Sequence, residues 1–160
     1  MEAYLGLGSN LGDRRANLAE ALRLLAERVE IVTVSSIYDT VPVGVGEQPR
    51  FLNAVCGIET GIGPLQLLSL VKGIEADMGR ELSLKNAPRV IDIDIILYGD
   101  AIVESPELTI PHPRMRERAF VLAPFAEIAP DVVHPVVGRN IAELAAEVDG
   151  GDGVENVGKL

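Results

Sequence analysis

The sequence contains a single cysteine, and this scarcity excludes several kinds of protein. With only Cys56 in 160 residues, the chain has no internal disulfide framework and cannot build a zinc site from cysteine ligands. Cys56 lies between Val55 and Gly57 in an apolar stretch, so we expect it to be a small core residue. The length is typical of one domain with a sizeable core, and we predict a single domain over residues 1–160.

Basic residues and long apolar runs are also scarce. The 14 lysines and arginines stand against 24 aspartates and glutamates, a formal net charge of −10, which argues against nucleic acid as a general partner. No apolar run approaches the roughly 20 residues that span a bilayer, and the first residues lack the basic region of a signal peptide. We therefore expect a cytoplasmic protein with no membrane partner.

The few basic residues are unevenly distributed along the chain. Six of the 14 lie between Arg80 and Arg118, together with seven acidic residues. In an acidic protein, arginines concentrated in one segment indicate local binding of a small anionic ligand rather than of a polyanion.

The hydrophobic pattern predicts a core of strands and helices in the order β-α-β-β-α-β. We expect strands at residues 3–7, 31–40, 51–60 and 90–98, and amphipathic helices at 14–29 and 64–79. Asp13 is the expected N-cap of the first helix. This order predicts a ferredoxin-like α+β fold with an antiparallel sheet and packed helices. C-terminal additions would be a short strand near 101–104, helices at 115–127 and 140–148, and a loosely ordered tail at 149–160.

Two aspartates stand two residues apart in the β-branched run Val90-Ile91-Asp92-Ile93-Asp94-Ile95-Ile96. Residues i and i+2 of a strand point to the same face, so Asp92 and Asp94 would share one face and the intervening isoleucines the other. Aspartate is depleted in strands, and like charges on one face repel each other. A bound divalent cation would compensate for both effects. The alternative is an amphipathic strand whose polar face lies in water.

The stretch Gly6-Leu7-Gly8-Ser9-Asn10-Leu11-Gly12 follows the first strand and precedes the first helix. It is similar to a dinucleotide-binding fingerprint, but its third glycine is one position late, and the sequence has no P-loop lysine motif. We therefore interpret it as a tight turn.

A second polar constellation is Pro111-His112-Pro113-Arg114-Met115-Arg116-Glu117-Arg118. The two prolines stiffen the backbone on either side of the histidine, and guanidinium groups pair bidentately with phosphate oxygens. Taken alone, this segment is equally consistent with a solvated helix start. Together with Arg80, Arg89 and the paired aspartates, it indicates metal-dependent chemistry on a nucleotide.

Seven segments form a distinctive series along the chain: Gly8-Ser9-Asn10, Tyr38-Asp39-Thr40-Val41-Pro42, Gln48-Pro49-Arg50-Phe51-Leu52-Asn53, residues 75–80, Ala87-Pro88-Arg89-Val90-Ile91-Asp92-Ile93-Asp94, Ile110-Pro111-His112-Pro113 and Arg118-Ala119-Phe120. In these segments and their order, the sequence resembles the 6-hydroxymethyl-7,8-dihydropterin pyrophosphokinases of folate biosynthesis. The resemblance implies transfer of the pyrophosphoryl group of ATP to the hydroxymethyl group of the pterin, with release of AMP.

The resemblance also implies roles for individual residues on the nucleotide side. Asp92 and Asp94 would hold two Mg²⁺ ions, and Arg80 and Arg89 would complete the catalytic group. ATP would be bound by a larger set: Lys72, Glu75, Arg80, Arg89, Ile95, Thr109, His112 and Arg118.

On the pterin side, the resemblance implies two stacking aromatic rings, Phe51 and Phe120, which suit a planar heterocycle. Asn53 offers both a donor and acceptors to the pterin edge. The full implied set is Thr40, Pro42, Val43, Phe51, Asn53, Asp92 and Phe120. We expect a monomer whose partners are ATP and the pterin.

Two other classes of function compete with this interpretation. A different metal-dependent enzyme, such as a nucleotide hydrolase, would produce ADP or pyrophosphate without a pterin. A non-enzymatic ferredoxin-like module would bind a small molecule and would need neither Mg²⁺ nor paired aspartates.

Overall fold

The computed structural model describes residues 1–40, 50–79 and 89–160, and its first elements follow the predicted order. They are β1 (Glu2–Ser9), α1 (Arg14–Ala26), β2 (Glu30–Val34), β3 (Tyr38–Thr40), β4 (Phe51–Glu59), α2 (Pro64–Asp77) and β5 (Asp92–Tyr98). The main sheet runs β5-β1-β4-β3-β8, where β8 is Val154–Asn156, and β2 also pairs with β4. All of these pairings are antiparallel. The predicted ferredoxin-like α+β fold is confirmed.

The elements after β5 add a small second sheet and two further helices. β6 (Val103–Glu104) pairs with β7 (Thr109–Ile110). The 3-10 helix η1 (Met115–Glu117) leads into α3 (Ala119–Ile128), and α4 (Ile141–Glu147) is followed by the 3-10 helix η2 (Gly151–Gly153). Over the described ranges, none of the helices has the length and apolar character required to span a membrane.

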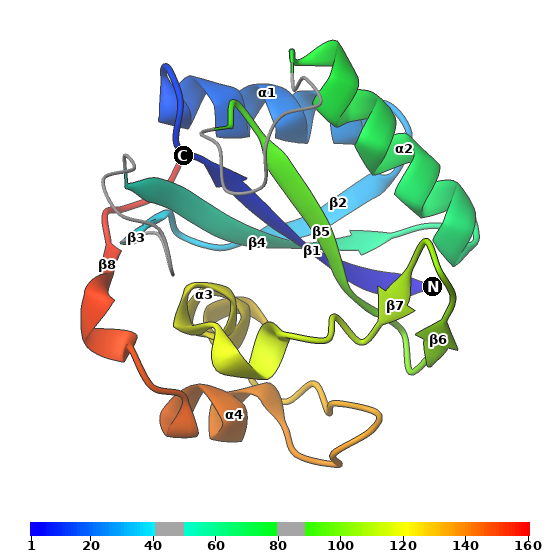
Figure 1. Ribbon diagram of the computed structural model, residues 1–160, viewed down its shortest axis with the longest axis vertical. Helices are drawn as coiled ribbons and strands as arrows, with labels where there is room; N and C mark the ends of the chain where they lie inside the picture. Colours follow the sequence, from blue (N-terminus) through cyan, green and yellow to red (C-terminus); the bar gives the residue numbers. More distant parts are fainter. Residues whose placement is uncertain (41–49, 80–88) are drawn as a thin grey trace.

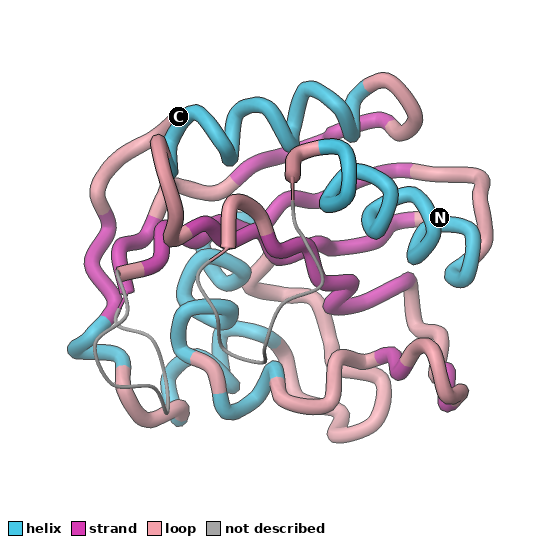
Figure 2. Tube along the Cα trace, turned by 45° about the horizontal axis from the view of Figure 1, so that its top comes forward, coloured by secondary structure: helices cyan, strands magenta, loops and turns pink. Residues whose placement is uncertain are grey.

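The helices lie on both faces of the main sheet. Figure 1 shows α1 and α2 on one face and α3 on the other, with α4 beyond α3. The turned view in Figure 2 keeps the same three layers. The sheet therefore has two covered faces, and each face builds its own apolar cluster.

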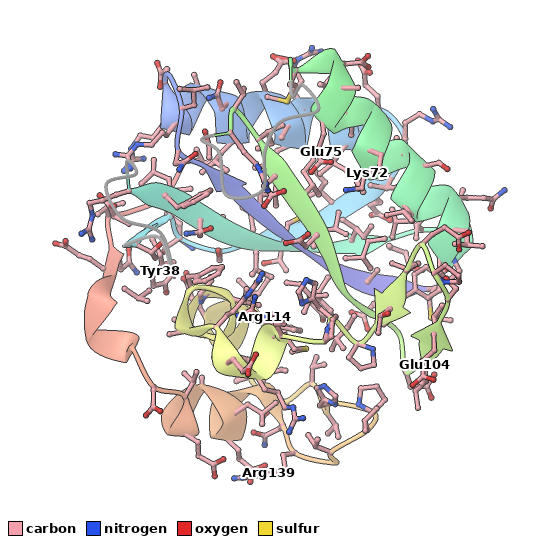
Figure 3. All side chains as sticks on the ribbon, viewed as in Figure 1. Tyr38, Lys72, Glu75, Glu104, Arg114 and Arg139 are labelled. Carbon is pink, nitrogen blue, oxygen red and sulfur yellow. The ribbon has the colours of Figure 1, made fainter. Side chains whose placement is uncertain are left out.

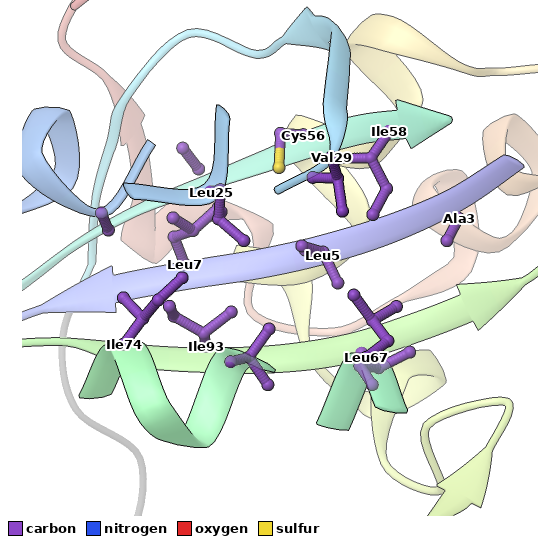
Figure 4. Packing of buried hydrophobic residues seen from close by; sticks show 14 of the residues in the cluster. Ala3, Leu5, Leu7, Leu25, Val29, Cys56, Ile58, Leu67, Ile74 and Ile93 are labelled. Carbon is purple, nitrogen blue, oxygen red and sulfur yellow. The ribbon is translucent and has the colours of Figure 1, made fainter. Parts of the chain in front are cut away.

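The cluster between the sheet and helices α1 and α2 is built from alternate strand residues. These residues meet apolar side chains spaced three or four apart on the helices, as expected for amphipathic elements; the members seen in Figure 4 include Leu5, Leu7, Leu25, Cys56, Leu67, Ile74 and Ile93. The prediction that Cys56 is a core residue is confirmed, because its side chain is fully buried. Burial raises the pKa of its thiol to about 12.

A β-bulge places two successive residues of β5 in the second cluster. The register between β1 and β5 shifts after Tyr4, so that Ile95 lies opposite Leu5, Leu97 lies opposite Tyr4, and Ile96 is the extra residue. A bulge places two residues opposite one and bends the strand locally. Ile96 and Leu97 both lie in the second cluster, with residues of α3 and α4. Ile96 and Leu97 are therefore packed with α3 and α4, whereas Asp92 and Asp94 lie outside that cluster.

The helix boundaries follow the expected capping residues. The Asp13 side chain accepts a hydrogen bond from Ala16 N at 3.1 Å, which confirms it as the N-cap of α1. Pro64 occupies the first turn of α2, where its missing N–H has no intrahelical partner to lose. Gly79 follows α2 with a φ of 93°, in the left-handed region that favours glycine after a helix.

Three predicted elements are interrupted or displaced in the structure. The predicted strand at 31–40 is broken at Ser35, whose hydroxyl donates to Ser36 O and accepts from Val55 N, and so competes with the sheet pairing. The predicted helix at 115–127 is interrupted at Arg118, where the backbone is extended. The predicted tight turn is also displaced: β1 continues through Ser9, so Gly6 and Gly8 lie within the strand.

The expectation of a loosely ordered tail at 149–160 is wrong. β8 pairs with β3, with Asn156 opposite Tyr38. Beyond β8, Val157 N donates to Ile37 O at 2.8 Å, and Ile37 N donates to Gly158 O at 2.7 Å. The glycine-rich composition is typical of a linker, but a distant strand supplies the hydrogen-bond partners that order this segment.

Candidate active site

A strip of small and polar residues crosses the face of the sheet beside the second apolar cluster. Gly8 pairs with Asn53 on one side and with Asp92 on the other, and Gly6 pairs with Asp94. Residues directly opposite each other in antiparallel strands project to the same face. We call these five residues the polar strip; they come from three adjacent strands, β4, β1 and β5.

Gly8 lies at the centre of the polar strip and is closely surrounded by its neighbours. A Cβ atom at Gly8 would lie 2.8 Å from Asn53 Oδ1 and 3.4 Å from Phe51 Cδ1. The first distance is too short for ordinary contact, so a side chain at this position would displace the Asn53 amide. The strand therefore requires glycine here for the close approach of its neighbours, and not for a turn.

Asp92 and Asp94 lie on the predicted face of β5. Both are partly buried, whereas Ile91, Ile93 and Ile95 are buried in the opposite cluster. The predicted division of this strand into a polar and an apolar face is therefore confirmed. Burial and then the charge of Asp92 raise the pKa of Asp94 to about 6.

The aspartate pair is suited to a hard divalent cation. Ionised carboxylates offer only acceptor oxygens, and Mg²⁺ is typically bound by one or two carboxylates together with water and substrate phosphates. Among the described residues, no group of three or more acidic, histidine or cysteine side chains could hold a metal ion. The pair alone therefore fits a cation that shares its coordination with a bound phosphate, rather than one enclosed entirely by protein.

Glu75 of α2 attaches the outer edge of β5 to the helix. Its Oε2 accepts a hydrogen bond from Ile93 N at 2.8 Å, and Lys72 Nζ lies 3.4 Å from its Oε1. The Glu75 side chain is 4% exposed and that of Lys72 is 59% exposed. Figure 3 shows both residues on the part of α2 beside β5. The structure thus brings both next to the aspartate pair, with the lysine amino group accessible.

Arg89 is held in place by its main chain and offers its side chain to a ligand. Its N–H donates to Asn10 Oδ1 at 2.7 Å, and its carbonyl accepts from Asn10 N at 3.0 Å. Nη1 lies 3.6 Å from Asp92 Oδ2. Its Nε is buried and has no hydrogen-bond acceptor in the described part of the chain. A buried guanidinium donor without an acceptor is suited to an anionic ligand such as phosphate.

His112 is oriented as a neutral hydrogen-bond donor. Its main-chain N–H donates to Ile96 O at 2.9 Å, and its Nδ1 accepts from Arg114 N at 3.2 Å. Burial, and then the positive charges of Arg118 and Arg114, lower its pKa to about 4. A neutral ring whose Nδ1 is an acceptor carries its proton on Nε2. The Nε2–H group is therefore available to a ligand oxygen.

Arg118 contacts an aromatic ring and acts electrostatically on Asp94. Its guanidinium carbon is 5.5 Å from the centroid of the Phe120 ring, a cation–π distance. Its charge opposes the rise in the pKa of Asp94 and contributes to the fall in that of His112. Arg118 therefore links the start of α3 to both polar groups of the site.

The other end of the polar strip is organised by an amide. The buried Asn53 donates through Nδ2 to Thr40 Oγ1 at 2.6 Å, and Phe51, two residues earlier on β4, projects to the same face. The register places Thr40 opposite Phe51. This end combines a hydrogen-bonding edge with an aromatic side chain.

The remaining predicted site residues lie elsewhere or outside the described residues. Ile95 is buried in the cluster under α1 and α2, so its side chain points away from the polar strip. Thr109 is exposed on β7. Arg80, Pro42 and Val43 fall outside the described residues.

Two residues of the site were not among those predicted. Gly8 forms the floor of the strip, and Asn10 holds the main chain of Arg89. Both belong to a glycine-rich stretch that we interpreted as a turn. The signal that identifies Gly8 is its register opposite Asp92, which requires the pairing of β1 with β5.

Comparison with known proteins now gives the family. The family model for 7,8-dihydro-6-hydroxymethylpterin-pyrophosphokinase (HPPK) matches residues 4–130. The chain belongs to this family. The resemblance seen in the sequence motifs is therefore confirmed.

Similar proteins include both short and long chains. The 2-amino-4-hydroxy-6-hydroxymethyldihydropteridine pyrophosphokinase of Methylorubrum extorquens is 46% identical over 157 residues, covering 97% of this chain and 98% of that protein. The Bacillus subtilis protein of the same name is 46% identical over 132 residues, 81% of this chain and 79% of that protein. The folic acid synthesis protein fol1 of Schizosaccharomyces pombe is 44% identical over 143 residues. The fol1 protein is much longer than this chain, and the chain spans only 20% of its length.

A solved structure supports the fold. The crystal structure of wild-type Plasmodium falciparum HPPK-DHPS with pterin and p-hydroxybenzoate superposes with a TM-score of 0.74 at 19% identity, covering 91% of this chain and 42% of that chain. At this identity, the similarity shows that the HPPK fold is shared.

The lowered pKa of the partly buried His112 leads to a prediction about pH. The unfolded chain takes up a proton on histidine near pH 6.5, whereas folded His112 does so only near pH 4. The unfolded state therefore binds more protons between these values, and the free energy of unfolding falls as pH is lowered through this window. We expect NMR titration of the ligand-free protein to show no protonation of His112 above pH 5. The NMR signal of His112 is assigned by its loss in His112→Asn. Protonation of His112 near pH 6.5 would contradict the lowered pKa of this side chain.

Proposed function

We propose that this chain transfers the pyrophosphoryl group of ATP to 6-hydroxymethyl-7,8-dihydropterin, giving the pterin diphosphate and AMP in folate biosynthesis. Its membership of the HPPK family supports this reaction. The single observation that carries the proposal is the polar strip: a pair of aspartates and an Asn53–Thr40 amide–hydroxyl pair lie on one face, on either side of Gly8. Such a strip accommodates a charged substrate at one end and a flat polar heterocycle at the other.

Asp92 and Asp94 are the proposed Mg²⁺ ligands, and we propose two ions. Bound Mg²⁺ would neutralise phosphate charge and polarise the phosphoryl group under attack. The raised pKa of Asp94 supports this assignment, since burial and a neighbouring negative charge leave a carboxylate that a cation would stabilise. Asp92 would also border the pterin, because it lies directly across Gly8 from Asn53.

The ATP phosphates would be bound by donors on the side of the strip that carries the aspartates. Arg89 offers its buried Nε, His112 its Nε2–H, and Arg118 its guanidinium group. Arg80, outside the described residues, is included from the family resemblance, as are Lys72 and Glu75. Adenine contacts at Ile95 and Thr109 would involve their main chains, because the Ile95 side chain is buried in the core.

The pterin would bind at the opposite end of the strip. Phe51 and Phe120 are the proposed stacking rings, and Asn53 with Thr40 would read the hydrogen-bonding edge of the heterocycle. Pro42 and Val43, outside the described residues, complete the proposed pterin set.

In the reaction, the hydroxymethyl oxygen of the pterin attacks the β-phosphorus of ATP. The new oxygen–phosphorus bond forms as the bond to the oxygen of the α-phosphate breaks, AMP leaves with that oxygen, and the hydroxyl proton is released. The arginines and His112 hold the phosphates, while Asn53 and the aromatic rings hold the acceptor. Positioning and charge neutralisation, rather than a strong general base, would supply most of the acceleration.

The proposal extends to the state and location of the protein. We propose a monomer as the active unit. A cytoplasmic location fits a reaction that consumes ATP.

A ³¹P NMR time course with ATP, Mg²⁺ and hydroxymethyldihydropterin tests the function. We expect AMP and a pterin diphosphate to appear together, and only when the pterin is present. ADP or pyrophosphate formed without the pterin would indicate a nucleotide hydrolase. Binding of the pterin with no reaction would indicate a non-enzymatic module, and either result would contradict the proposal.

Replacing Asp94 separates its role in catalysis from its role in folding. We expect Asp94→Asn to lower turnover by on the order of a hundredfold or more. We do not expect its Tm to fall, since the substitution removes one of two adjacent negative charges. Asp100→Asn, at an exposed position after β5, is the matched control. Wild-type turnover in Asp94→Asn would contradict the metal assignment.

The floor of the strip provides a second test. Gly8→Ala places a methyl group against Asn53 Oδ1, so we expect the KM for the pterin to rise about tenfold, the equivalent of one displaced polar contact. The KM for ATP should change less. Gly61→Ala, where a Cβ has no neighbour within 4 Å, is the control. An unchanged KM for the pterin would show that Asn53 does not contact it.

A further inference from the structure

Strand β3 is short and lies between two partners. Its three residues pair with β4 on one side and with β8 on the other. The pairing with the C-terminal segment continues past β3, since Ile37 exchanges main-chain hydrogen bonds with Val157 and Gly158. Because β8 covers the outer edge of β3, the position of β3 depends on residues far away in the sequence.

A single carboxylate connects this segment to α3. Glu127 accepts hydrogen bonds from Ser36 N at 3.0 Å, from Ser36 Oγ at 2.8 Å and from Tyr38 Oη at 2.7 Å. Lys159 Nζ donates to the same carboxylate at 3.0 Å. Although burial acts in the opposite direction, these hydrogen bonds lower the pKa of Glu127, so the group is ionised at neutral pH.

The C-terminal segment is also attached to the opposite layer. Arg15 of α1 donates to Val157 O at 2.6 Å and to Lys159 O at 3.1 Å. The segment is thus held by α1 on one side of the sheet and by Glu127 of α3 on the other. Figure 1 shows β8 and the C-terminus next to β3 and the N-terminal end of α1.

Strand β3 also contacts the pterin end of the polar strip. Tyr38 lies directly opposite Asn53, and Thr40 accepts the Asn53 amide hydrogen bond at 2.6 Å. A shift of β3 relative to β4 would therefore move Thr40 away from Asn53 and leave a buried amide without its acceptor. The distance between Asn53 Nδ2 and Thr40 Oγ1 therefore depends on how firmly β3 is held.

We propose that Glu127 and residues 154–159 form a brace on β3 that positions Thr40 and Asn53, and so sets the affinity for the pterin but not for ATP. This inference rests on the proposed function of the same site. Residues 154–159 lie beyond the stretch matched by the family model, which ends at residue 130. In the brace, Glu127 and Lys159 are positioning residues, since they act on the substrate only through β3.

The experiment compares variants that loosen the brace to different degrees. Glu127→Gln keeps an acceptor oxygen for Tyr38 but loses the ion pair with Lys159, Lys159→Met loses the ion pair alone, and Glu127→Ala loses every contact. Glu147→Gln is the matched control, because Glu147, the last residue of α4, makes an ion pair with Arg139 and none with β3 or β8 is among its described contacts. Tm, both KM values and the Kd for the pterin are measured for each protein.

We expect the KM and Kd for the pterin to rise about threefold in Lys159→Met and Glu127→Gln, and about tenfold or more in Glu127→Ala. The KM for ATP should stay within about twofold. The double variant Glu127→Gln with Lys159→Met should be no worse than Glu127→Gln, because both substitutions remove the same ion pair. The control should match the wild type.

Three results would overturn the brace: a lower Tm with unchanged pterin affinity, an equal rise in both KM values, or the same change in Glu147→Gln. Pterin Kd is measured with Mg²⁺ and a non-hydrolysable ATP analogue, so it is independent of turnover. If the wild type binds the pterin but forms no AMP, the proposed function fails, and the Kd comparison still decides the brace. If the wild type does not bind the pterin, both proposals fail.

Discussion

The antiparallel register of β1 with β5 is the constraint on which the rest of the site depends. It places Gly6 opposite Asp94 and Gly8 opposite Asp92. Each aspartate therefore has a residue without a side chain as its neighbour on β1. A slip of one residue would turn the aspartates into the core and expose the isoleucines between them. The packing of those isoleucines against α1 and α2 therefore selects the register, and the same packing that stabilises the fold orients the proposed metal ligands.

The site is assembled around an electrostatic imbalance. The two aspartates repel each other, and burial adds to that cost, as the raised pKa of Asp94 shows. Arg118 offsets part of it, and Arg89 leaves a buried Nε without an acceptor among the described residues. His112 stays neutral because burial and the nearby arginines oppose its protonation. The aspartate repulsion and the unpaired Arg89 Nε are unfavourable in the free protein and would be relieved by a metal-bound polyphosphate, which is consistent with pyrophosphoryl transfer in this family.

Prediction from the sequence succeeded where the signal was local. Period-two alternation around Asp92 and Asp94 identified their face, Asp13 identified a helix start, and Pro64 another. It failed where a distant partner decided the outcome. The segment at 149–160 has the composition of a linker, yet β3 pairs with it. Ser35 breaks a β-branched run because its hydroxyl finds Val55 across the sheet. Gly8 looked like a turn residue because its true neighbours, Asn53 and Asp92, lie on other strands.

The sequence by itself determined the order of elements, the polar face of β5, the concentration of arginines near it and, through the motifs, the family. These features depend on residues that are close together in the sequence. A few consecutive positions are enough to show the period of a strand or a helix and the chemistry of its neighbouring side chains. Only the tertiary structure decided that Gly8 forms the floor of the strip, that Asn10 holds Arg89, that Glu75 binds the edge of β5 and that Glu127 joins β3 to the C-terminal segment. Each of these contacts joins residues that are far apart in the chain, and the packing that brings them together has no local signature.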